Sequence, residues 1–467
     1  MIRLPRYKNA SVGVFGLGTA GQAAIASLLQ SDAKVYAWDD NANSCAQLAE
    51  SKAKNLTVKN FTQWPWQEMD CVILSPGVPL THPQPHEVVR LAQKNAVRLV
   101  GEVDILYEAR PDARYVGITG TNGKSTTTAL IGHVLQENGL SAQVGANLGV
   151  PALALTTTGA EDIYVLEMSS YQLDLMHTTR FNVAVLLNIT PDHLDRHGDM
   201  AGYIAAKQRI FQHQKSEDAA FIGVDDAYSC KLYDAIRQRN TQHVTPLSIT
   251  QTNNTAIHVD SNGVLHDPTT TPVFRYDLTQ LQRLKGAHNW QNIAAAYGVA
   301  RYFAIDSNAI MRTIYNFSGL PHRLELVAQL GNVQFINDSK ATNAEAAARA
   351  LAPFDNIYWL VGGRAKAGGI DALAPYFNKI THAYLMGEAE DSFAQSLEGK
   401  VAYTKCGTLK NALHMANEAA QDNKKETVVL LSPACASFDQ WKSFEARGDA
   451  FRDQVMELAS KGVSSCA

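Results

Sequence analysis

Short apolar runs alternate with amphipathic segments along most of the chain, and the apolar runs end in glycine or polar residues. The short runs predict strands, and the amphipathic segments between them predict helices. Such alternation is typical of an α/β protein in which helices flank a mostly parallel sheet. The predicted strands are residues 11–15, 34–38, 71–74, 98–100, 113–116, 163–166, 183–189, 333–336, 357–361, 383–386 and 427–431.

Two breaks divide this pattern. The first strands and helices complete a small doubly wound unit by residue 105, and Ser318–Arg323 combines Gly and Pro as a linker does. We therefore predict three domains, 1–105, 106–318 and 319–467. We expect a Rossmann-like N-terminal domain, a central P-loop domain and a Rossmann-like C-terminal domain. The polar stretch 240–280 predicts an irregular sheet or hairpin insertion.

Composition narrows the class of protein. The net charge is −4, from 41 basic and 45 acidic residues, with no basic block of the kind that binds nucleic acid. The six cysteines form no CxxC pair, which fits a reducing compartment rather than a disulfide framework or zinc knuckle. The apolar run 11–29 follows basic residues as in a signal peptide, but spaced glycines split it into strand and helix. We expect a cytoplasmic protein without membrane insertion.

The glycine-rich stretch Gly117–Thr126 lies between a predicted strand and a predicted helix. The N–H groups of such a loop face an anion, a lysine adds positive charge, and Ser or Thr can bind Mg²⁺. The strict pattern has Gly five residues before Gly123, where this chain has Ile118. An ordinary glycine-rich turn is the alternative. We predict that ATP phosphates are bound by Gly120, Thr121, Asn122, Gly123, Lys124, Ser125, Thr126 and Thr127.

The chain has another glycine turn, Gly16–Gly21, which is the first glycine turn in chain order. It follows the first predicted strand, and Asp39 and Asp40 end the next predicted strand. This is the dinucleotide fingerprint, which by itself favours NAD, although the same turn can hold any diphosphate. Ser75–Gly77 ends a third strand and predicts either a backbone-lined ligand site or an ordinary turn.

Further polar residues follow the later strands. Glu167 ends a buried strand, where a Mg²⁺-directed acid belongs, although a capping or salt-bridged Glu is the alternative. Asp192–His197 is dense in Asp and His and predicts either a metal site or a knot of salt bridges. Lys207, taken alone, suits a surface lysine. Asn289 and Asn292 share one helix face, for ligand binding or capping.

Motifs in order along essentially the whole chain resemble the Mur ligase superfamily. They are GITGTNGKST, LEMSSYQL, NITPDHLDRH, YIAAKQRIF, GAHNWQN, GLPHRLE, NDSKATN and SPACASFDQWKSFEARG. The SPACASFDQ ending favours the D-glutamate-adding member over its sisters. The resemblance implies a ligase of peptidoglycan precursor synthesis that uses ATP and two Mg²⁺ ions to join D-glutamate to UDP-MurNAc-L-alanine. It reassigns the first glycine turn to the UDP diphosphate, and we expect a monomer.

The resemblance also implies site residues. Lys124, Lys207, His193 and Asn147 are expected to be catalytic, with Lys207 carbamylated. Ser125, Glu167, His193 and Lys207 are expected to bind metal, and Asn289, Asn292, Arg323 and Asp338 to bind ATP. The UDP substrate is assigned to Gly16, Leu17, Gly18, Thr19, Asp39, Asp40, Ser75 and Gly77. D-glutamate is assigned to Lys340, Thr342, Lys366, Ser437, Phe438 and Phe444. One departure is GGRAK at 362–366, where the family more often has Gly-Gly-Asp-x-Lys.

Three rival functions remain. An NAD(P)-dependent oxidoreductase would explain Gly16–Gly21 and Asp39 but not the phosphate loop. A nucleotide switch that binds ATP and a partner protein would need no amino-acid site. Folylpolyglutamate synthase also joins glutamate to a carboxylate, but that family lacks an N-terminal UDP-binding unit.

Overall fold

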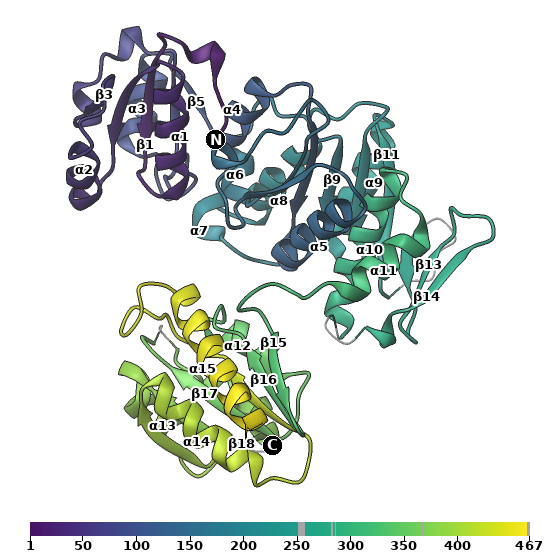
Figure 1. Cartoon of the computed structure of the whole chain (residues 1–467). Coiled ribbons are helices and arrows are strands. Elements are labelled where there is room, and N and C mark those ends of the chain that lie inside the picture. The colour runs from purple at the N-terminus through teal and green to yellow at the C-terminus, as the bar shows by residue number, and fades with distance from the viewer. Residues whose placement is uncertain (251–256, 282–283, 285, 366–367, 465–467) are drawn as a thin grey trace. The chain divides into compact units, whose positions relative to one another are not determined.

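The computed structural model describes residues 1–250, 257–281, 284, 286–365 and 368–464 (Figure 1). The chain forms two compact units, one of Met1–Leu281 with Ala287–Phe317 and the other built from Ser318 onward. The described residues form three sheets, and most of their strand pairs are parallel. The predicted α/β fold class is confirmed. Among the described residues, no helix has both the length and the apolar character needed to cross a membrane.

The first sheet is fully parallel, with strand order β3-β2-β1-β4-β5. Its strand order changes direction between β1 and β4, so the carboxyl ends of these two strands form the ligand-binding edge expected of a doubly wound sheet. The strands are β1 (Ser11–Phe15), β2 (Lys34–Trp38), β3 (Leu56–Val58), β4 (Cys71–Leu74) and β5 (Arg98–Val100). The helices are α1 (Thr19–Gln30), α2 (Ala42–Ala49), α3 (Glu87–Lys94) and the following α4 (Glu102–Ala109).

The second sheet has the order β14-β13-β12-β11-β10-β9-β6-β8-β7 and is parallel from β7 to β12. The predicted insertion is an antiparallel extension, in which β13 pairs with β12 and β14. The strands are β6 (Arg114–Thr119), β7 (Ala142–Ala146), β8 (Ile163–Glu167), β9 (Val183–Leu186), β10 (Ala219–Gly223), β11 (His243–Ser248), β12 (Ile257–Val259), β13 (Val264–Asp267) and β14 (Phe274–Asp277).

Several helices flank the second sheet, and α5 and α10 carry residues of the polar motifs. Helices α5 and α10 pack against each other, and both lie beside this sheet in Figure 1. The helices are α5 (Lys124–Glu137), α6 (Ser170–Asp174), α7 (Leu194–His197), α8 (Met200–Gln208), α9 (Ala227–Arg239), α10 (Ala287–Tyr302) and α11 (Ser307–Asn316).

The third sheet, in the second unit, has the order β15-β16-β20-β17-β18-β19, with only β15 antiparallel to its neighbour. The strands are β15 (Glu325–Leu330), β16 (Val333–Asn337), β17 (Ile357–Gly362), β18 (Ile380–Met386), β19 (Tyr403–Gly407) and β20 (Thr427–Leu431). The helices are α12 (Ala344–Leu351), α13 (Glu390–Leu397), α14 (Leu409–Gln421) and α15 (Phe444–Ser464).

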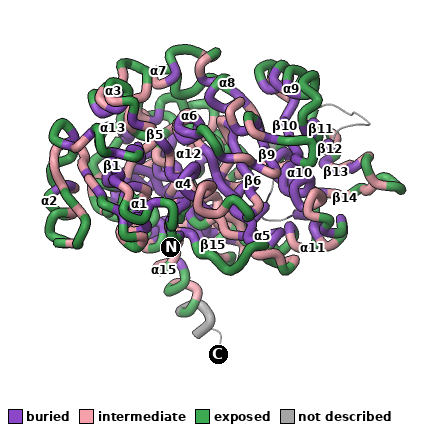
Figure 2. The backbone as a smooth tube through the Cα atoms, turned by 90° about the horizontal axis from the view of Figure 1, so that it is seen from above, coloured by how far each residue is buried: buried purple, intermediate pink, exposed green. Residues whose placement is uncertain are grey.

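One continuous apolar core joins the first two sheets. Ile2 and Leu4, α1 and the buried turn at Ala152–Leu153 all belong to it, and the Ile2 N–H donates to the Leu153 carbonyl at 3.1 Å. Burial is densest along the strands, as β6 and β9 show in Figure 2. This packing stabilises the first two sheets as one body and holds their carboxyl-edge loops in place.

Candidate active site

The predicted phosphate loop follows β6 and leads directly into α5. Gly120 has φ +154° and Gly123 has φ +86°, a backbone region that L side chains rarely adopt. A Cβ at Gly123 would lie 2.4 Å from Oδ1 of Asn292, so the loop requires glycine there for space as well as for conformation. The predicted strand, glycine turn and helix are present, and anion binding at the N-terminus of α5 stays a prediction.

Lys124 and Lys207 converge on this loop from different elements. Lys124 Nζ donates to the carbonyls of Gly120 and Thr121, both at 2.9 Å, and Lys207 Nζ donates to the Gly120 carbonyl at 2.8 Å. Lys207 is only 1% exposed, so it is not the surface lysine that its sequence suggests when taken alone. Burial and the nearby Lys124 charge lower the pKa of Lys207 to about 7. A large fraction of the Lys207 amine is therefore uncharged near neutral pH.

Glu167 ends β8 beside the loop and is 3% exposed. Its Oε1 accepts a 2.6 Å hydrogen bond from the side-chain amide of Asn147, a residue that lies just after β7. Its Oε2 is buried and has no hydrogen-bond partner among the described residues. A buried carboxylate oxygen left without a partner is costly, and a hard cation is the kind of ligand that would satisfy it.

His193 precedes α7 with φ +53°. Its Nδ1 is hydrogen-bonded to the Tyr171 hydroxyl at 2.9 Å, and the two rings lie 4.9 Å apart. Asp192 lies 3.4 Å from His193 Nε2. Within the part of the chain that the structure describes, no three His, Cys, Asp or Glu side chains are grouped to hold a metal ion. The predicted magnesium ligands are Ser125, Glu167, His193 and Lys207. This set includes a hydroxyl and a lysine, which are not among those four residue types, and it stays a prediction.

The two asparagines of α10 face the phosphate loop. Asn292 accepts a 3.1 Å hydrogen bond from the Thr127 hydroxyl, and its own amide donates to Oδ1 of Asn289 at 3.1 Å. A further residue, Asn188, escaped the sequence analysis. Its Oδ1 accepts from the Asn122 N–H at 2.9 Å, so it fixes the loop from the end of β9. Its place in the NITPDH motif was the available signal.

The other predicted phosphate-loop residues occupy the first turn of α5 and the bend before it. Ser125 is nearly buried, and the Thr121 hydroxyl donates to the Thr190 carbonyl at 3.1 Å. Thr126 is half-buried at the start of α5. The loop is thus tied to the segment after β9 on one side and to α10 on the other.

The first glycine turn lies between β1 and β4. Gly16 has φ +98°, and a Cβ there would lie 2.3 Å from Cβ of Ser75, so the two turns touch at this edge of the sheet. Gly18 and Thr19 are exposed at the start of α1, whereas Leu17 is buried. Gly77 has open space around its Cα. The predicted UDP-binding residues of both turns therefore share one edge.

The two acids after β2 are both engaged. Asp39 accepts from the N–H of Leu17 at 2.6 Å and from the N–H of Asn41 at 2.8 Å, so it shapes the glycine turn itself. Asp40 pairs with His86 Nε2 at 3.1 Å and is mostly exposed. Asp39 therefore has a structural role that the fingerprint alone does not reveal.

The second unit holds the remaining predicted residues. Asp338 follows β16 and is buried, and its carboxylate accepts from the Leu324 N–H at 3.2 Å and the Ser432 hydroxyl at 3.0 Å. Burial raises the pKa of Asp338 to about 7 despite the nearby charge of Arg323. The Lys340 ammonium stands 5.5 Å from the Phe444 ring centre. Thr342 follows in the same loop, where its N–H donates to the Lys340 carbonyl at 2.9 Å.

The loop after β20 faces the loop after β17. Ala436 and Arg364 pair through two backbone hydrogen bonds of 2.9 and 3.0 Å. Ser437 is buried, whereas Phe438 is 64% exposed. Arg364, at the departure from the family pattern, forms a two-point ion pair with Glu388, with both contacts at 3.0 Å. Lys366 lies outside the described residues.

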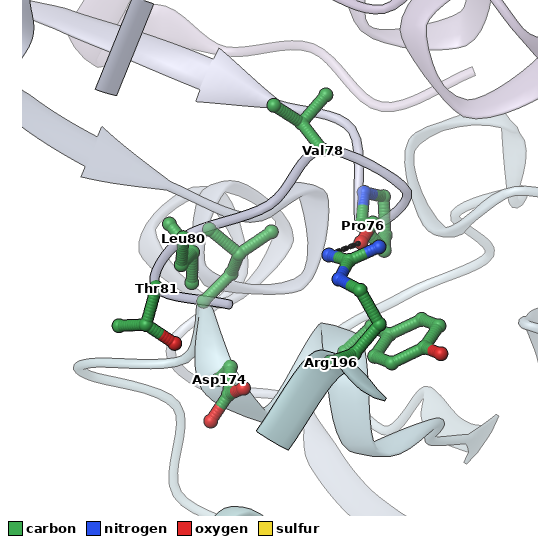
Figure 3. A pocket seen from close by; sticks show the side chains of 8 residues that line it. Pro76, Val78, Leu80, Thr81, Asp174 and Arg196 are labelled. Carbon is green, nitrogen blue, oxygen red and sulfur yellow. Dashed lines mark hydrogen bonds between the residues drawn. The ribbon is translucent and has the colours of Figure 1, made fainter. Parts of the chain in front are cut away.

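A pocket also lies between the turn after β4 and helices α6 and α7, and Figure 3 shows Arg196 directed at the Pro76 carbonyl from its wall. The sequence analysis assigned no role to Tyr171 or Arg196. Both stand inside quoted motifs, but their partners are distant in sequence. The residues that line the pocket are Pro76, Val78, Leu80, Thr81, Tyr171, Asp174, Leu175 and Arg196.

Three family models match this chain in order. "Mur ligase MurD-like, N-terminal domain" matches residues 10–101, "Mur ligase middle domain" matches 118–300, and "Mur ligase, glutamate ligase domain" matches 322–435. The matched middle region contains the phosphate loop, Glu167, His193 and Lys207. The matched last region contains Arg323, Asp338 and Lys340.

Curated relatives align along the whole chain. The UDP-N-acetylmuramoylalanine--D-glutamate ligase of Rhodospirillum rubrum is 45% identical over 462 residues, which cover 98% of this chain and 97% of the relative. The protein of the same name from Caulobacter vibrioides is 44% identical over 469 residues, 99% of each chain. Among solved structures, UDP-N-acetylmuramate-alanine ligase MurC from Thermotoga maritima has a similar fold, with a TM-score of 0.57, 16% identity, and 96% of this chain and 99% of that chain covered.

Proposed function

Because this chain belongs to the Mur ligase family, we propose that it is an ATP-dependent amide ligase that adds D-glutamate to UDP-N-acetylmuramoyl-L-alanine. The observation that carries the proposal is the phosphate loop, with Lys124 and the buried Lys207 on one carbonyl and Glu167 beside them. Ligases that activate a carboxylate need a triphosphate held at such a point. The full-length likeness to enzymes of that name supports the choice of substrates.

The proposed reaction has two chemical steps. The alanine carboxylate of the UDP substrate attacks the γ-phosphorus of ATP, a P–O bond breaks, and ADP leaves with an acyl phosphate formed. The uncharged amine of D-glutamate then attacks the acyl carbon, the amide C–N bond forms, and phosphate leaves as the amine loses a proton. Lys124 and the N–H groups at the start of α5 stabilise the negative charge on the phosphoryl group.

Magnesium is part of the proposal. Bound Mg²⁺ would neutralise phosphate charge, and Glu167 Oε2, the Ser125 hydroxyl and the His193 imidazole are the groups that would hold it. Glu167 fits this role because its buried oxygen lacks a partner among the described residues. We propose that Lys207 enters the set as a carbamate. Its uncharged amine adds to the carbon of CO₂ and loses a proton, which replaces an ammonium with an anionic oxygen ligand.

We propose that Asn289, Asn292, Arg323 and Asp338 contact ATP, and that the turns at Gly16–Thr19 and Ser75–Gly77 bind the UDP diphosphate. We assign D-glutamate to the second unit, at Lys340, Thr342, Lys366, Ser437, Phe438 and Phe444. We further propose that the enzyme acts as a monomer in the cytoplasm, where ATP is available.

The rival oxidoreductase is disfavoured by the three family matches, which are all to Mur ligase models. The Asp39 carboxylate, which would bind ribose hydroxyls in a dinucleotide enzyme, accepts one main-chain N–H on each oxygen, from Leu17 and Asn41. The MurD-like N-terminal match over residues 10–101 disfavours folylpolyglutamate synthase, because that family lacks such a unit. Titration with NADH and with UDP distinguishes the oxidoreductase from the proposed ligase directly.

The decisive experiment is an ADP- and phosphate-release assay on the purified protein with Mg²⁺, ATP and UDP-MurNAc-L-alanine. We expect phosphate release with D-glutamate and little with L-glutamate or meso-diaminopimelate. Release that depends on meso-diaminopimelate would assign a sister reaction. No nucleotide consumption with all co-reactants present would overturn the proposal.

A further inference from the structure

Arg196 reaches from the loop after β9 to the turn after β4. Its Nη1 donates to the Gly77 carbonyl at 2.7 Å, and its Nη2 donates to the Pro76 carbonyl at 3.5 Å. These carbonyls belong to the turn that we assign to the UDP substrate. Figure 3 shows this contact, with Arg196 rising from α7 toward Pro76. A side chain of the ATP-binding part of the chain therefore holds the backbone of the substrate turn.

The same guanidinium also contacts Tyr171, the hydrogen-bond partner of the proposed magnesium ligand His193. It stands over the Tyr171 ring, 4.6 Å from the ring centre, and the Tyr171 hydroxyl is hydrogen-bonded to His193 Nδ1 at 2.9 Å. The partner of Nδ1 fixes the orientation of the ring, and Nε2, which faces the Asp192 carboxylate at 3.4 Å, is the nitrogen that would bind a metal. The main-chain N–H of Arg196 also donates to the His193 carbonyl at 3.1 Å, which is a local backbone contact at the start of α7. Tyr171 is therefore the side chain that links the guanidinium to the imidazole.

An ion pair would be the simpler explanation of the Arg196 position, and the contacts of the nearby acid disfavour it. Asp174 lines the same pocket, but its carboxylate pairs with His197 Nδ1 at 3.3 Å. Within the described part of the chain, the side-chain hydrogen bonds of Arg196 go to main-chain carbonyls. Neutralising the Arg196 charge is therefore not what sets its position. The planar guanidinium holds a turn with its edge and a ring with its face, a combination that lysine cannot reproduce.

We propose that Arg196 is a positioning residue, which joins the Pro76–Gly77 substrate turn to His193 through Tyr171. The inference rests on the proposed function, because it concerns how that function's substrate and magnesium ligands are aligned. Binding of the UDP substrate orders the turn, and the order passes to the imidazole through the guanidinium and the phenol. Loss of Arg196 should therefore affect both substrate affinity and the turnover step.

The test uses the full-length enzyme and the variants Arg196→Ala, Arg196→Lys, Tyr171→Phe and the double variant Arg196→Ala/Tyr171→Phe. Arg114→Ala is the matched control, because Arg114 also stacks on an aromatic ring, Phe303 at 5.1 Å, but lies at the start of β6. Each protein is assayed for kcat, the KM of UDP-MurNAc-L-alanine and the Mg²⁺ concentration that gives half-maximal activity. Calorimetry without ATP gives the Kd of the UDP substrate, and a thermal melt checks folding.

We expect Arg196→Ala to raise the Kd and KM of the UDP substrate about tenfold and to lower kcat about tenfold. Tyr171→Phe should lower kcat and raise the Mg²⁺ requirement by a similar factor, with KM nearly unchanged. Arg196→Lys should recover part of the KM but not kcat, and Arg114→Ala should match the wild type. Because both residues act through His193, the double variant should lose little more kcat than the worse single variant.

Two results would overturn the inference while leaving the proposed function intact. One is an active wild type in which Arg196→Ala changes KM alone. The other is a double variant whose kcat loss equals the product of the two single losses. Tyr171→Phe removes one hydroxyl only, so it keeps the test decisive if Arg196→Ala does not fold. An inactive wild type would instead refute the proposed function.

Discussion

Among single residues, Lys207 has the environment with the most direct chemical consequence. It is buried, and its ammonium would sit beside that of Lys124, with both donating to the carbonyl of Gly120. Burial disfavours the charged form of Lys207 and repulsion from Lys124 adds to this effect, so the pKa of Lys207 falls to about 7. A carbamate goes further, because it puts a negative charge next to Lys124 and an oxygen where a cation needs a ligand.

Replacing Lys207 with alanine tests this role. We expect Lys207→Ala to lower kcat by roughly 100-fold or more, because a charged ligand near the transferring phosphoryl group is lost. Added formate or acetate should restore part of the activity by supplying a carboxylate in the vacated space. Lys215→Ala, at an exposed lysine of the same domain, is the control and should remain fully active. A fully active Lys207→Ala enzyme would rule out the carbamate.

The same lysine predicts a pH effect. CO₂ adds only to the uncharged amine, which predominates above the Lys207 pKa of about 7 and becomes scarce below it. In CO₂-depleted buffer, we therefore expect activity to fall as the pH drops below about 7, and added bicarbonate to restore it more at pH 7 than at pH 6. The measurement is initial rate against pH with and without bicarbonate. Identical profiles would contradict the prediction.

Among the elements, α5 offers a matched pair of substitutions, because one glycine precedes the helix and another follows it. Gly123 precedes α5 with φ +86° and Gly139 follows it with φ +81°. Alanine is strained at both, but a Cβ at Gly123 would meet Asn292, whereas Gly139 has open space. We expect both variants to lose stability by about 1 kcal/mol or more. Only Gly123→Ala should lose ATP binding, measured by calorimetry with a non-hydrolysable analogue. Equal affinity in the two variants would show that Gly123 does not shape the phosphate site.

The same loop shows how far sequence reasoning can go. The strand, the glycine turn and the helix from Lys124 were predictable, because local spacing determines them. The contacts of Asn188 and Arg196 were not, because their partners lie 66 and 119 residues away. Lys207 was misplaced by its residue type, since only tertiary packing reveals its burial. Asp39 was correctly located, but only the structure shows that its carboxylate holds the turn. The predicted insertion at 240–280 proved to extend the second sheet, since edge pairing depends on neighbours that are distant in sequence.

At the scale of the whole molecule, the residues that we assign to the UDP substrate and to D-glutamate lie in different units. The first unit contains the glycine turn at Gly16–Gly21, the turn at Ser75–Gly77 and the phosphate loop, and it holds every residue that we assign to the UDP substrate. The second begins at Ser318 and contains every residue that we assign to D-glutamate. The proposed reaction requires the amine from the second unit to reach the acyl phosphate formed in the first. The chain between the units must therefore permit that approach.

Gly319 tests this requirement because it lies at the junction, has φ +87° and has open space around it. Proline would force φ to about −65° and so redirect the chain, while alanine can still adopt the positive φ at a cost in strain. We expect Gly319→Pro to keep the wild-type Kd for the ATP analogue and for UDP-MurNAc-L-alanine. Its D-glutamate-dependent phosphate release should fall by roughly 100-fold, because a misdirected amine loses the benefit of proximity. Gly319→Ala should stay within about threefold of wild type, since φ there is only disfavoured. If Gly319→Pro turned over normally, the approach of the second unit would not depend on the backbone direction at this residue, and the junction would have to be sought elsewhere in Ser318–Arg323.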